Sequence, residues 1–313
     1  MIVTLTLNPS LDRTIEVASL RRGAVIRAAA THLDPGGKGV NVSRALLANR
    51  VRSCAVVPFG GDEGRRLVSL LSAEGIEMVT VPVAGATRSN VALAEPDGTV
   101  TKINEPGTAL SPAELEALAA AVLGAAGSAD WVVASGSLPP RVPVDVYARL
   151  CERFTGAGIN VAVDTSGPAF VHALTQAPAL VKPNREELSE ATGMVISCLG
   201  DAIKAAESLR ERGAGTVLAS LGADGAILLQ GDQVWFGRCA LAEPRSSVGA
   251  GDAMLAGFLA AGACGQEALV EALAWATAAV GLPGSRMPGP DDIRRDDVRV
   301  IAADPTLPLR SGG

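Results

Sequence analysis

The sequence predicts an α/β fold in which helices cover a mainly parallel β-sheet. Short segments rich in β-branched residues alternate with longer amphipathic segments along most of the chain, and this alternation is typical of parallel strands connected by helices. The chain has 313 residues and is 48% hydrophobic, so it can bury a large core. We therefore expect residues 1–313 to form a single domain with one elaboration.

The individual elements follow in order from the local patterns. Residues 2–7 are expected to form the first core strand, because Ile, Val and Leu dominate them. Further strands are expected at 54–58, 130–134, 159–163, 178–181, 215–219 and 225–229. Helical periodicity predicts helices at 39–49, 63–74, 112–124, 143–156, 185–192 and 200–212. The Ala-rich segments 251–263 and 267–282 are interrupted by Gly and Glu, which favours buried helices over membrane spans.

Two segments, about 12–35 and 87–105, break this alternation. Within the second, Arg88 to Glu95 and Thr99 to Asn104 flank a Pro-Asp-Gly turn at 96–98, a pattern typical of a β-hairpin. We expect the two segments to form a small polar sheet that is inserted into the α/β body and acts as a lid.

Composition and charge exclude several classes of protein. The net charge is −6 and the basic residues are scattered, whereas a nucleic-acid surface requires a basic stripe. The five cysteines lie far apart in the sequence and predict reduced thiols, not a disulfide framework or a metal site. The N-terminal segment lacks the basic start and cleavage site of a signal peptide. We expect a cytoplasmic protein that binds neither nucleic acid nor membrane.

The segment 246–258 is the strongest indication of function. Its turn, Gly249-Ala250-Gly251, opens an apolar helix, so backbone N–H groups and the positive end of the helix converge on one point, as in anion sites. Asp252 follows directly. An acid is unfavourable beside a bound phosphate unless it accepts the proton of a hydroxyl that attacks that phosphate. The alternative is an ordinary helix start in which Asp252 only complements the dipole.

Other nucleotide-binding motifs are missing. Gly37-Lys38, the single Gly-Lys pair, is followed by Gly39 and not by Ser or Thr, and no Gly-x-Gly-x-x-Gly follows the first strand. A P-loop NTPase and a Rossmann dehydrogenase are therefore not expected.

A second glycine cluster, Pro35 to Asn41, lets backbone approach a ligand before a helix begins. Asp12 follows the first strand, at the end where open α/β sheets bind ligands. A plain loop-to-helix turn and a solvated aspartate are the alternatives.

Six segments in this order resemble the PfkB branch of the ribokinase-like sugar kinases. They are Asn8-Pro-Ser-Leu-Asp12, Gly36-Gly-Lys-Gly-Val-Asn41, Ser135-Gly-Ser-Leu-Pro139, Val181-Lys-Pro-Asn-Arg-Glu-Glu-Leu188, Ser220-Leu-Gly-Ala-Asp-Gly225 and Val248-Gly-Ala-Gly-Asp252. The resemblance covers nearly the whole chain. It implies a ribokinase-like three-layer α/β/α sandwich with a small β-sheet lid.

Two further segments are similar to one subgroup of that family. Ile103 to Gly107 and Leu282 to Ser285 look most like the 1-phosphofructokinases and tagatose-6-phosphate kinases. The resemblance implies ATP-dependent phosphorylation of a ketohexose phosphate, with fructose 1-phosphate favoured. Tagatose-6-phosphate kinase, 6-phosphofructokinase and a non-catalytic sugar-phosphate-binding regulator are the alternatives.

The resemblance also assigns roles to residues on the nucleotide side. Asp252 would be the general base, and the amides of Gly249, Ala250 and Gly251 would hold the charge of the transferring phosphoryl group. Asn184 and Glu187 would order Mg²⁺ largely through water, although an Asn cap with Glu at the third helical position is an equally sound interpretation. ATP would be contacted by Lys182, Asn184, Ser220, Gly222 and Gly225.

On the acceptor side, the resemblance implies that Asp12, Gly37 and Asn41 bind sugar hydroxyls and that Ser137 approaches the acceptor. Lys38, Arg88 and Lys102 are the candidate cations for the acceptor's own phosphate. A homodimer through the lid is expected, because a partner would cover the open edges and apolar face of a small sheet. Ser246 and Val248 replace the acidic residue and threonine of potassium-binding relatives, which leaves potassium activation open.

Overall fold

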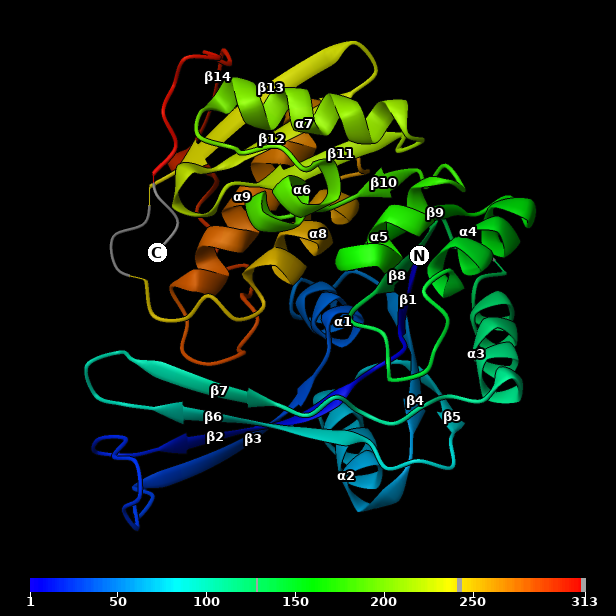
Figure 1. The fold of residues 1–313 in the computed structure, drawn as a ribbon, viewed down its shortest axis with the longest axis vertical. Coiled ribbons are helices and arrows are strands. Elements are labelled where there is room, and N and C mark those ends of the chain that lie inside the picture. Colours follow the sequence, from blue (N-terminus) through cyan, green and yellow to red (C-terminus); the bar gives the residue numbers. More distant parts are fainter. Residues whose placement is uncertain (128, 241–243, 311–313) are drawn as a thin grey trace.

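The computed structural model describes residues 1–127, 129–240 and 244–310. Figure 1 shows a central sheet between two layers of helices, with a second, smaller sheet projecting from the body. The ten-stranded central sheet has the order β14 (Val298–Ile301), β13 (Gln233–Cys239), β12 (Ala226–Gln230), β11 (Thr216–Ser220), β10 (Leu180–Val181), β9 (Asn160–Asp164), β8 (Trp131–Ser135), β1 (Ile2–Thr6), β4 (Ser53–Phe59) and β5 (Met78–Pro82).

The strands from β11 to β5 run parallel, while β11–β12, β12–β13 and β13–β14 pair antiparallel. The prediction of a mainly parallel α/β sheet is therefore confirmed. The carboxyl ends of β1, β8 and β9 lie side by side, since Thr6 pairs with Ser135 and Ser135 with Asp164. This edge of the sheet carries the loops in which the sequence places most ligand contacts.

The helices bury apolar faces on both sides of this sheet. They are α1 (Lys38–Ala48), α2 (Gly61–Glu74), α3 (Pro112–Ala125), α4 (Val146–Gly156), α5 (Gly167–Leu174), α6 (Arg185–Thr192), α7 (Leu199–Glu211), α8 (Ala250–Ala260) and α9 (Gly265–Val280). One core joins α3, α4, α5 and α7 to side chains such as Val3 and Leu5 of β1. A second joins α1, α8 and α9 to the opposite face, for example at Ile2. The alternation along β1 is what a strand covered on both faces requires.

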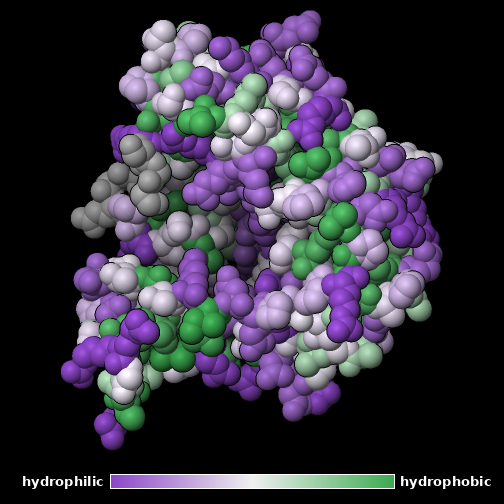
Figure 2. All heavy atoms as spheres, viewed as in Figure 1, coloured by the Kyte–Doolittle hydropathy of each residue, from purple (hydrophilic) through white to green (hydrophobic). Residues whose placement is uncertain are grey.

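The small sheet has the order β3 (Ala30–Gly36), β2 (Ser10–Glu16), β6 (Arg88–Ala94) and β7 (Val100–Asn104). The predicted hairpin is confirmed as β6 and β7. The register places Leu11, Ile15, Val91, Leu93 and Ile103 on one face and Asp12, Asn90 and Lys102 on the other. Ile103 is 58% exposed. Figure 2 shows hydrophobic residues gathered on this part of the surface.

Sequence patterns missed β5, β13, β14 and α5. Met78–Pro82 and Gln233–Cys239 lie at or next to the sheet margins, where exposed residues interrupt the continuous burial that marks a central strand. The eight residues of α5 begin with Gly-Pro, and about two turns of helix carry little periodic signal. The helix expected from residue 143 begins at Val146, after a turn that contains Pro143.

Candidate active site

Asp252 lies in the first turn of α8, which begins after Gly249 with φ at 76°. A larger residue would be strained by this left-handed backbone, and a Cβ atom at Gly249 would lie 2.5 Å from Cε of Met287. No side chain within the described ranges caps this helix. The start of α8 therefore presents backbone amides and a positive dipole end to the space beside Asp252.

The carboxylate of Asp252 is buried and held by α1. Its Oδ2 atom accepts a hydrogen bond of 2.8 Å from Nδ2 of Asn41, and the residue is 7% exposed. Burial and the nearby carboxylate of Asp164 raise the pKa of Asp252 to about 6, although Lys38, Asn41 and Lys182 oppose the rise. An acid that only complemented the helix dipole would have a lowered pKa. The environment is therefore that of a proton acceptor that works near neutral pH.

Two lysine amines flank the fully buried carboxylate of Asp164, at the end of β9. Nζ of Lys38 donates a 2.7 Å hydrogen bond to Oδ1, and Nζ of Lys182 lies 3.2 Å from Oδ2. Burial alone raises the pKa of Asp164 and lowers that of Lys38, but the ion pairs reverse both directions. Asp164 and Lys38 therefore stay charged at neutral pH.

Lys182 extends from this cluster to the start of α8. A Cβ atom placed on Gly251 would lie only 3.1 Å from Nζ of Lys182, so glycine permits the close approach. The side chain of Lys182 is 4% exposed. Its positive charge adds to the potential of the helix N-terminus, and the two together form a binding site suited to an anion.

Asn184 and Glu187 form the capping box that the sequence left open as an interpretation. Oδ1 of Asn184 accepts from the backbone N–H of Glu187, and Oε2 of Glu187 accepts from the N–H of Asn184. The other oxygen of Glu187 lies 3.5 Å from Nζ of Lys38. Both side chains thus start α6, and the second carboxylate oxygen of Glu187 also contacts the lysine–carboxylate cluster.

Ser220, Gly222 and Gly225 form the turn between β11 and β12. Ser220 forms an isolated bridge to Asn184, and Gly222 and Gly225 both have positive φ, at 62° and 112°. These residues therefore form a tight turn. It lies directly beside the start of α6.

Asp12, on β2, is fixed by two neighbours on the acceptor side. Its Oδ1 atom accepts hydrogen bonds from Oγ of Ser10 at 2.6 Å and from Nδ2 of Asn90 at 2.9 Å. Gly37, the residue before α1, follows the end of β3, which pairs with β2. The carboxylate thus lies beside the predicted glycine cluster.

The three candidate phosphate cations differ in their surroundings. Arg88 donates from Nη1 to the carbonyl of Glu105 at 3.1 Å, and its Nε is buried without a partner among the described residues. Lys102 is exposed, on the Asp12 face of the small sheet. Lys38 is instead held by Asp164 and Glu187. Only Arg88 and Lys102 therefore face the sheet's polar side.

Ser137 lies near the start of the loop that follows β8, two residues after Ser135. Its Oγ atom is within 3.2 Å of Nδ2 of Asn8, which also donates to the carbonyl of Pro106 at 3.1 Å. A small hollow of about 20 Å³ is lined by Asn8, Arg88 and neighbouring loop residues. The structure thus brings Ser137 and Arg88 to the same region through Asn8.

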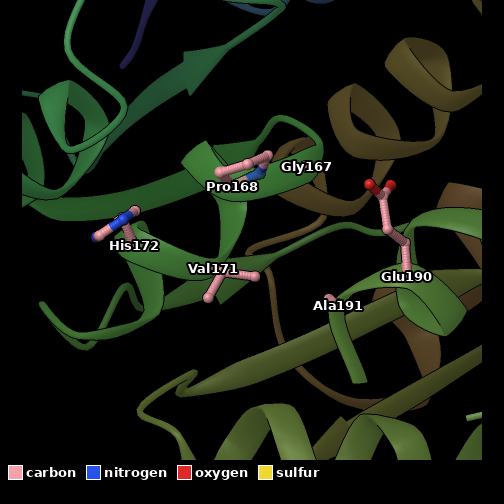
Figure 3. Close-up of a pocket in the computed structure, with 6 residues that line it drawn as sticks. All are labelled: Gly167, Pro168, Val171, His172, Glu190 and Ala191. Atoms are coloured by element: carbon pink, nitrogen blue, oxygen red, sulfur yellow. The ribbon is translucent and has the colours of Figure 1, made fainter. Parts of the chain in front are cut away.

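A larger hollow, of about 240 Å³, lies elsewhere, between α5 and α6 (Figure 3). It is lined by Gly167, Pro168, Val171, His172, Glu190 and Ala191. None of these residues belongs to the Asp252 cluster or to the small sheet. The larger of the two hollows is therefore separate from the candidate active site around Asp252.

Asp164 is the site residue that sequence patterns missed. It stands at the end of a predicted strand, yet its two lysine partners are distant in sequence, and Lys38 is 126 positions away. A charged residue directly after a buried parallel strand was the available signal. Within residues 1–127, 129–240 and 244–310 no group of three His, Cys, Asp or Glu side chains is arranged to hold a metal ion. In the same ranges no helix is long and apolar enough to cross a membrane.

Comparison of the sequence with those of known proteins identifies the family of this chain. The model of the pfkB family carbohydrate kinases matches residues 5–287. The chain belongs to the pfkB family of carbohydrate kinases. The 1-phosphofructokinase of Rhodobacter capsulatus is 38% identical over 297 residues, which cover 93% of each chain. The ATP-dependent 6-phosphofructokinase isozyme 2 of Mycobacterium tuberculosis H37Rv is 35% identical over 97% of this chain and 91% of its own.

A solved structure of this family agrees with the fold. The potassium complex of phosphofructokinase-2 from Escherichia coli superposes with a TM-score of 0.88 at 34% identity, covering 93% of this chain and 96% of that one. The predicted ribokinase-like fold and carbohydrate kinase class are confirmed. In this pfkB chain Oγ of Ser246 accepts a hydrogen bond from the N–H of Val248 at 3.2 Å, so the two residues that depart from potassium-binding relatives form one local turn.

Proposed function

We propose that this chain transfers the γ-phosphoryl group of ATP to the free terminal hydroxyl of fructose 1-phosphate, forming fructose 1,6-bisphosphate. The observation that carries the proposal is the buried Asp252 carboxylate, which has a raised pKa and lies at the uncapped start of α8. The similarity to 1-phosphofructokinases over most of the chain supports the choice of acceptor.

Asp252 takes the proton of the acceptor hydroxyl. The hydroxyl oxygen forms a bond to the γ-phosphorus, and the bond from that phosphorus to the bridging oxygen breaks, so that ADP leaves. Asn41 holds the carboxylate in place through its 2.8 Å hydrogen bond. A positioned base of this kind contributes about 10²–10⁴-fold in rate.

The start of α8 and Lys182 stabilise the charge of the transferring group. The amides of Gly249, Ala250 and Gly251 supply donors at the helix start, where the amide of Ala250 makes only a long contact of 3.5 Å to the carbonyl of Ser247. Lys182 adds a positive charge at the same point. The turn of Ser220, Gly222 and Gly225, with Asn184, contacts the remainder of the nucleotide.

Mg²⁺ fits this site through water. Kinase metals are bound mainly by substrate phosphates and waters with one or two protein carboxylates. One carboxylate oxygen of Glu187 lies beside Lys38 of the cluster, and Asn184 belongs to the same capping box, so these two residues would hold the ion through water. When bound, the ion neutralises phosphate charge. A direct cage of protein ligands is not required, in keeping with the absence of a three-residue metal cluster in the described part of the chain.

The small sheet binds the acceptor and acts as a lid. Asp12, Gly37 and Asn41 bind sugar hydroxyls, with Ser137 beside them. Arg88 and Lys102 bind the acceptor's phosphate, because both lie on the polar face and Nε of Arg88 is buried without a partner among the described residues. Closure of such a sheet excludes water, which would otherwise compete as the phosphoryl acceptor.

The opposite face of the small sheet joins two copies of the chain. Its apolar residues Ile15, Val91, Leu93 and Ile103 share this face, and β3 and β7 leave open edges. A second copy would cover both features in a symmetric pairing. A monomeric mass together with full activity at high dilution would contradict this dimer.

A coupled ADP-release assay tests the proposed function. With fructose 1-phosphate and ATP the wild-type chain should release ADP in proportion to fructose 1,6-bisphosphate formed. A non-catalytic regulator would bind the sugar phosphate in calorimetry without releasing ADP. If the chain phosphorylated only tagatose 6-phosphate or only fructose 6-phosphate, that sugar phosphate would replace fructose 1-phosphate as the proposed acceptor.

A further inference from the structure

Arg44 lies on α1, three residues after Asn41, and its side chain is 9% exposed. Its Nε and Nη2 atoms donate to the two carboxylate oxygens of Glu74, at the end of α2, over 2.7 and 2.8 Å. A two-point contact of this type holds the planar guanidinium in one orientation. The direction of the remaining nitrogen, Nη1, is therefore fixed.

Nη1 of Arg44 lies between two backbone carbonyls from distant parts of the chain. It donates to Ser285 at 3.1 Å and approaches Pro35 at 3.5 Å. Ser285 ends the conspicuous segment Leu282 to Ser285, for which the reaction itself gives no role. Pro35 is the first residue of the glycine cluster Pro35 to Asn41. One guanidinium thus contacts both segments.

Ser285 is close in sequence to Met287, which packs against the glycine turn of α8. Met287 is 8% exposed, and its Cε atom would be 2.5 Å from a Cβ atom at Gly249. Asn49, at the other end of α1, donates to the carbonyl of Pro288 at 2.8 Å. Residues 285–288 are therefore held on α1 at both ends, with Met287 packed against Gly249 between them.

Pro35, the other contact of Arg44, is next to the backbone that packs on Asp12 of the proposed acceptor site. Pro35 and Gly36 are the last residues of β3, and a Cβ atom at Gly36 would lie 2.3 Å from Oδ2 of Asp12. A shift of this strand end would therefore move the backbone that packs on Asp12. The charge of Arg44 also opposes the rise that burial causes in the pKa of Asp34, the neighbouring residue.

We propose that Arg44 is a positioning residue that holds the acceptor-side backbone at Pro35 in register with the α8 glycine turn at Gly249. The inference rests on the proposed phosphoryl transfer, in which the acceptor hydroxyl and γ-phosphate must meet in one geometry. A misplacement of about 1 Å can cost about a hundredfold in rate. Lysine cannot replace this residue, because a single amine cannot bind both Glu74 oxygens while reaching two carbonyls.

The first test compares Arg44→Lys with Arg52→Lys, a matched change at an exposed pair in which Nε lies 3.5 Å from Glu77. In Arg44→Lys we expect kcat to fall about tenfold and the KM for the sugar phosphate to rise. The Kd for ADP should stay within twofold, about the scatter of such measurements, because Arg44 contacts no proposed nucleotide residue. Arg52→Lys should match the wild type. Glu74→Gln, which weakens the same contact from its other partner, should change the parameters in the same direction as Arg44→Lys.

The second test, backbone hydrogen exchange, does not depend on activity. Arg44→Lys should accelerate exchange in both 34–37 and 284–289, whereas Asn49→Ala should do so only in the second segment. A lower Tm with unchanged kcat, KM and exchange in both segments would overturn the proposal and leave Arg44 a purely structural residue. If the wild type phosphorylates no sugar phosphate, the proposed function fails, and the exchange comparison still decides whether Arg44 links the two segments.

Discussion

Replacing Asp252 by asparagine should abolish turnover while leaving the site intact. Asn41 donates to Oδ2 of Asp252, and the amide oxygen of asparagine can accept the same hydrogen bond. The amide cannot accept the hydroxyl proton. The expected loss in kcat is about 10²–10⁴-fold, equivalent to about 3–5 kcal/mol of transition-state stabilisation.

The same substitution should stabilise the fold at pH 8. Burial raises the pKa of Asp252 from 3.8 to about 6, so the folded state binds the proton more tightly than the unfolded state. The ionised carboxylate therefore lowers the free energy of unfolding as the pH rises through this range, by up to about 3 kcal/mol. Asp252→Asn removes this cost, and its Tm at pH 8 should be equal to or above that of the wild type.

Steady-state kinetics, ADP calorimetry and thermal unfolding measure these effects. Asp62→Asn is the matched control, since Asp62 also lies in the first turn of a helix but is 86% exposed. It should leave kcat unchanged. Retention of more than about a tenth of wild-type kcat in Asp252→Asn would show that Asp252 is not the base.

Three further predictions test other parts of the site. Because Asp252 must be ionised and its pKa is raised to about 6, kcat/KM should fall about tenfold per pH unit below that value; a flat profile between pH 7 and pH 5 would contradict the assignment. Arg88→Ala should lower kcat/KM for the sugar phosphate by about 10–100-fold through loss of a charge-assisted contact, with little change for ATP. Equal effects on both substrates, or no difference from Arg52→Ala, an exposed arginine outside the small sheet, would remove Arg88 from the acceptor site. Ile103→Asp should convert the proposed dimer to a monomer in light scattering, because Ile103 is 58% exposed on the apolar face. Asp97→Asn on the neighbouring turn should leave the mass unchanged, and a dimeric Ile103→Asp variant would place the interface elsewhere.

Much of the fold was predictable because its elements are strongly patterned. The buried strands β1, β8 and β9 and the helices α1, α2 and α7 lie within one or two residues of their predicted bounds. Edge elements such as β5 and β14 escaped detection, since their partial exposure weakens the apolar pattern.

The candidate site was predictable where its residues are close in sequence. Gly249 to Asp252 form one turn, and Asn184 and Glu187 form one capping box. The pairing of Lys38 with Asp164 and the contacts of Arg44 with Ser285 were not predictable, because each joins residues more than a hundred positions apart. Such contacts depend on strand order and helix packing, which local sequence patterns do not encode.

The most direct measurement is kcat/KM for fructose 1-phosphate, tagatose 6-phosphate and fructose 6-phosphate, determined with the same enzyme and saturating ATP and Mg²⁺, with each product identified by mass and ³¹P NMR. The account predicts the highest kcat/KM for fructose 1-phosphate, fructose 1,6-bisphosphate as its product, and a kcat at least about a hundredfold lower for Asp252→Asn with each of the three sugars. Binding of all three sugars by the wild-type chain without ADP release would contradict it.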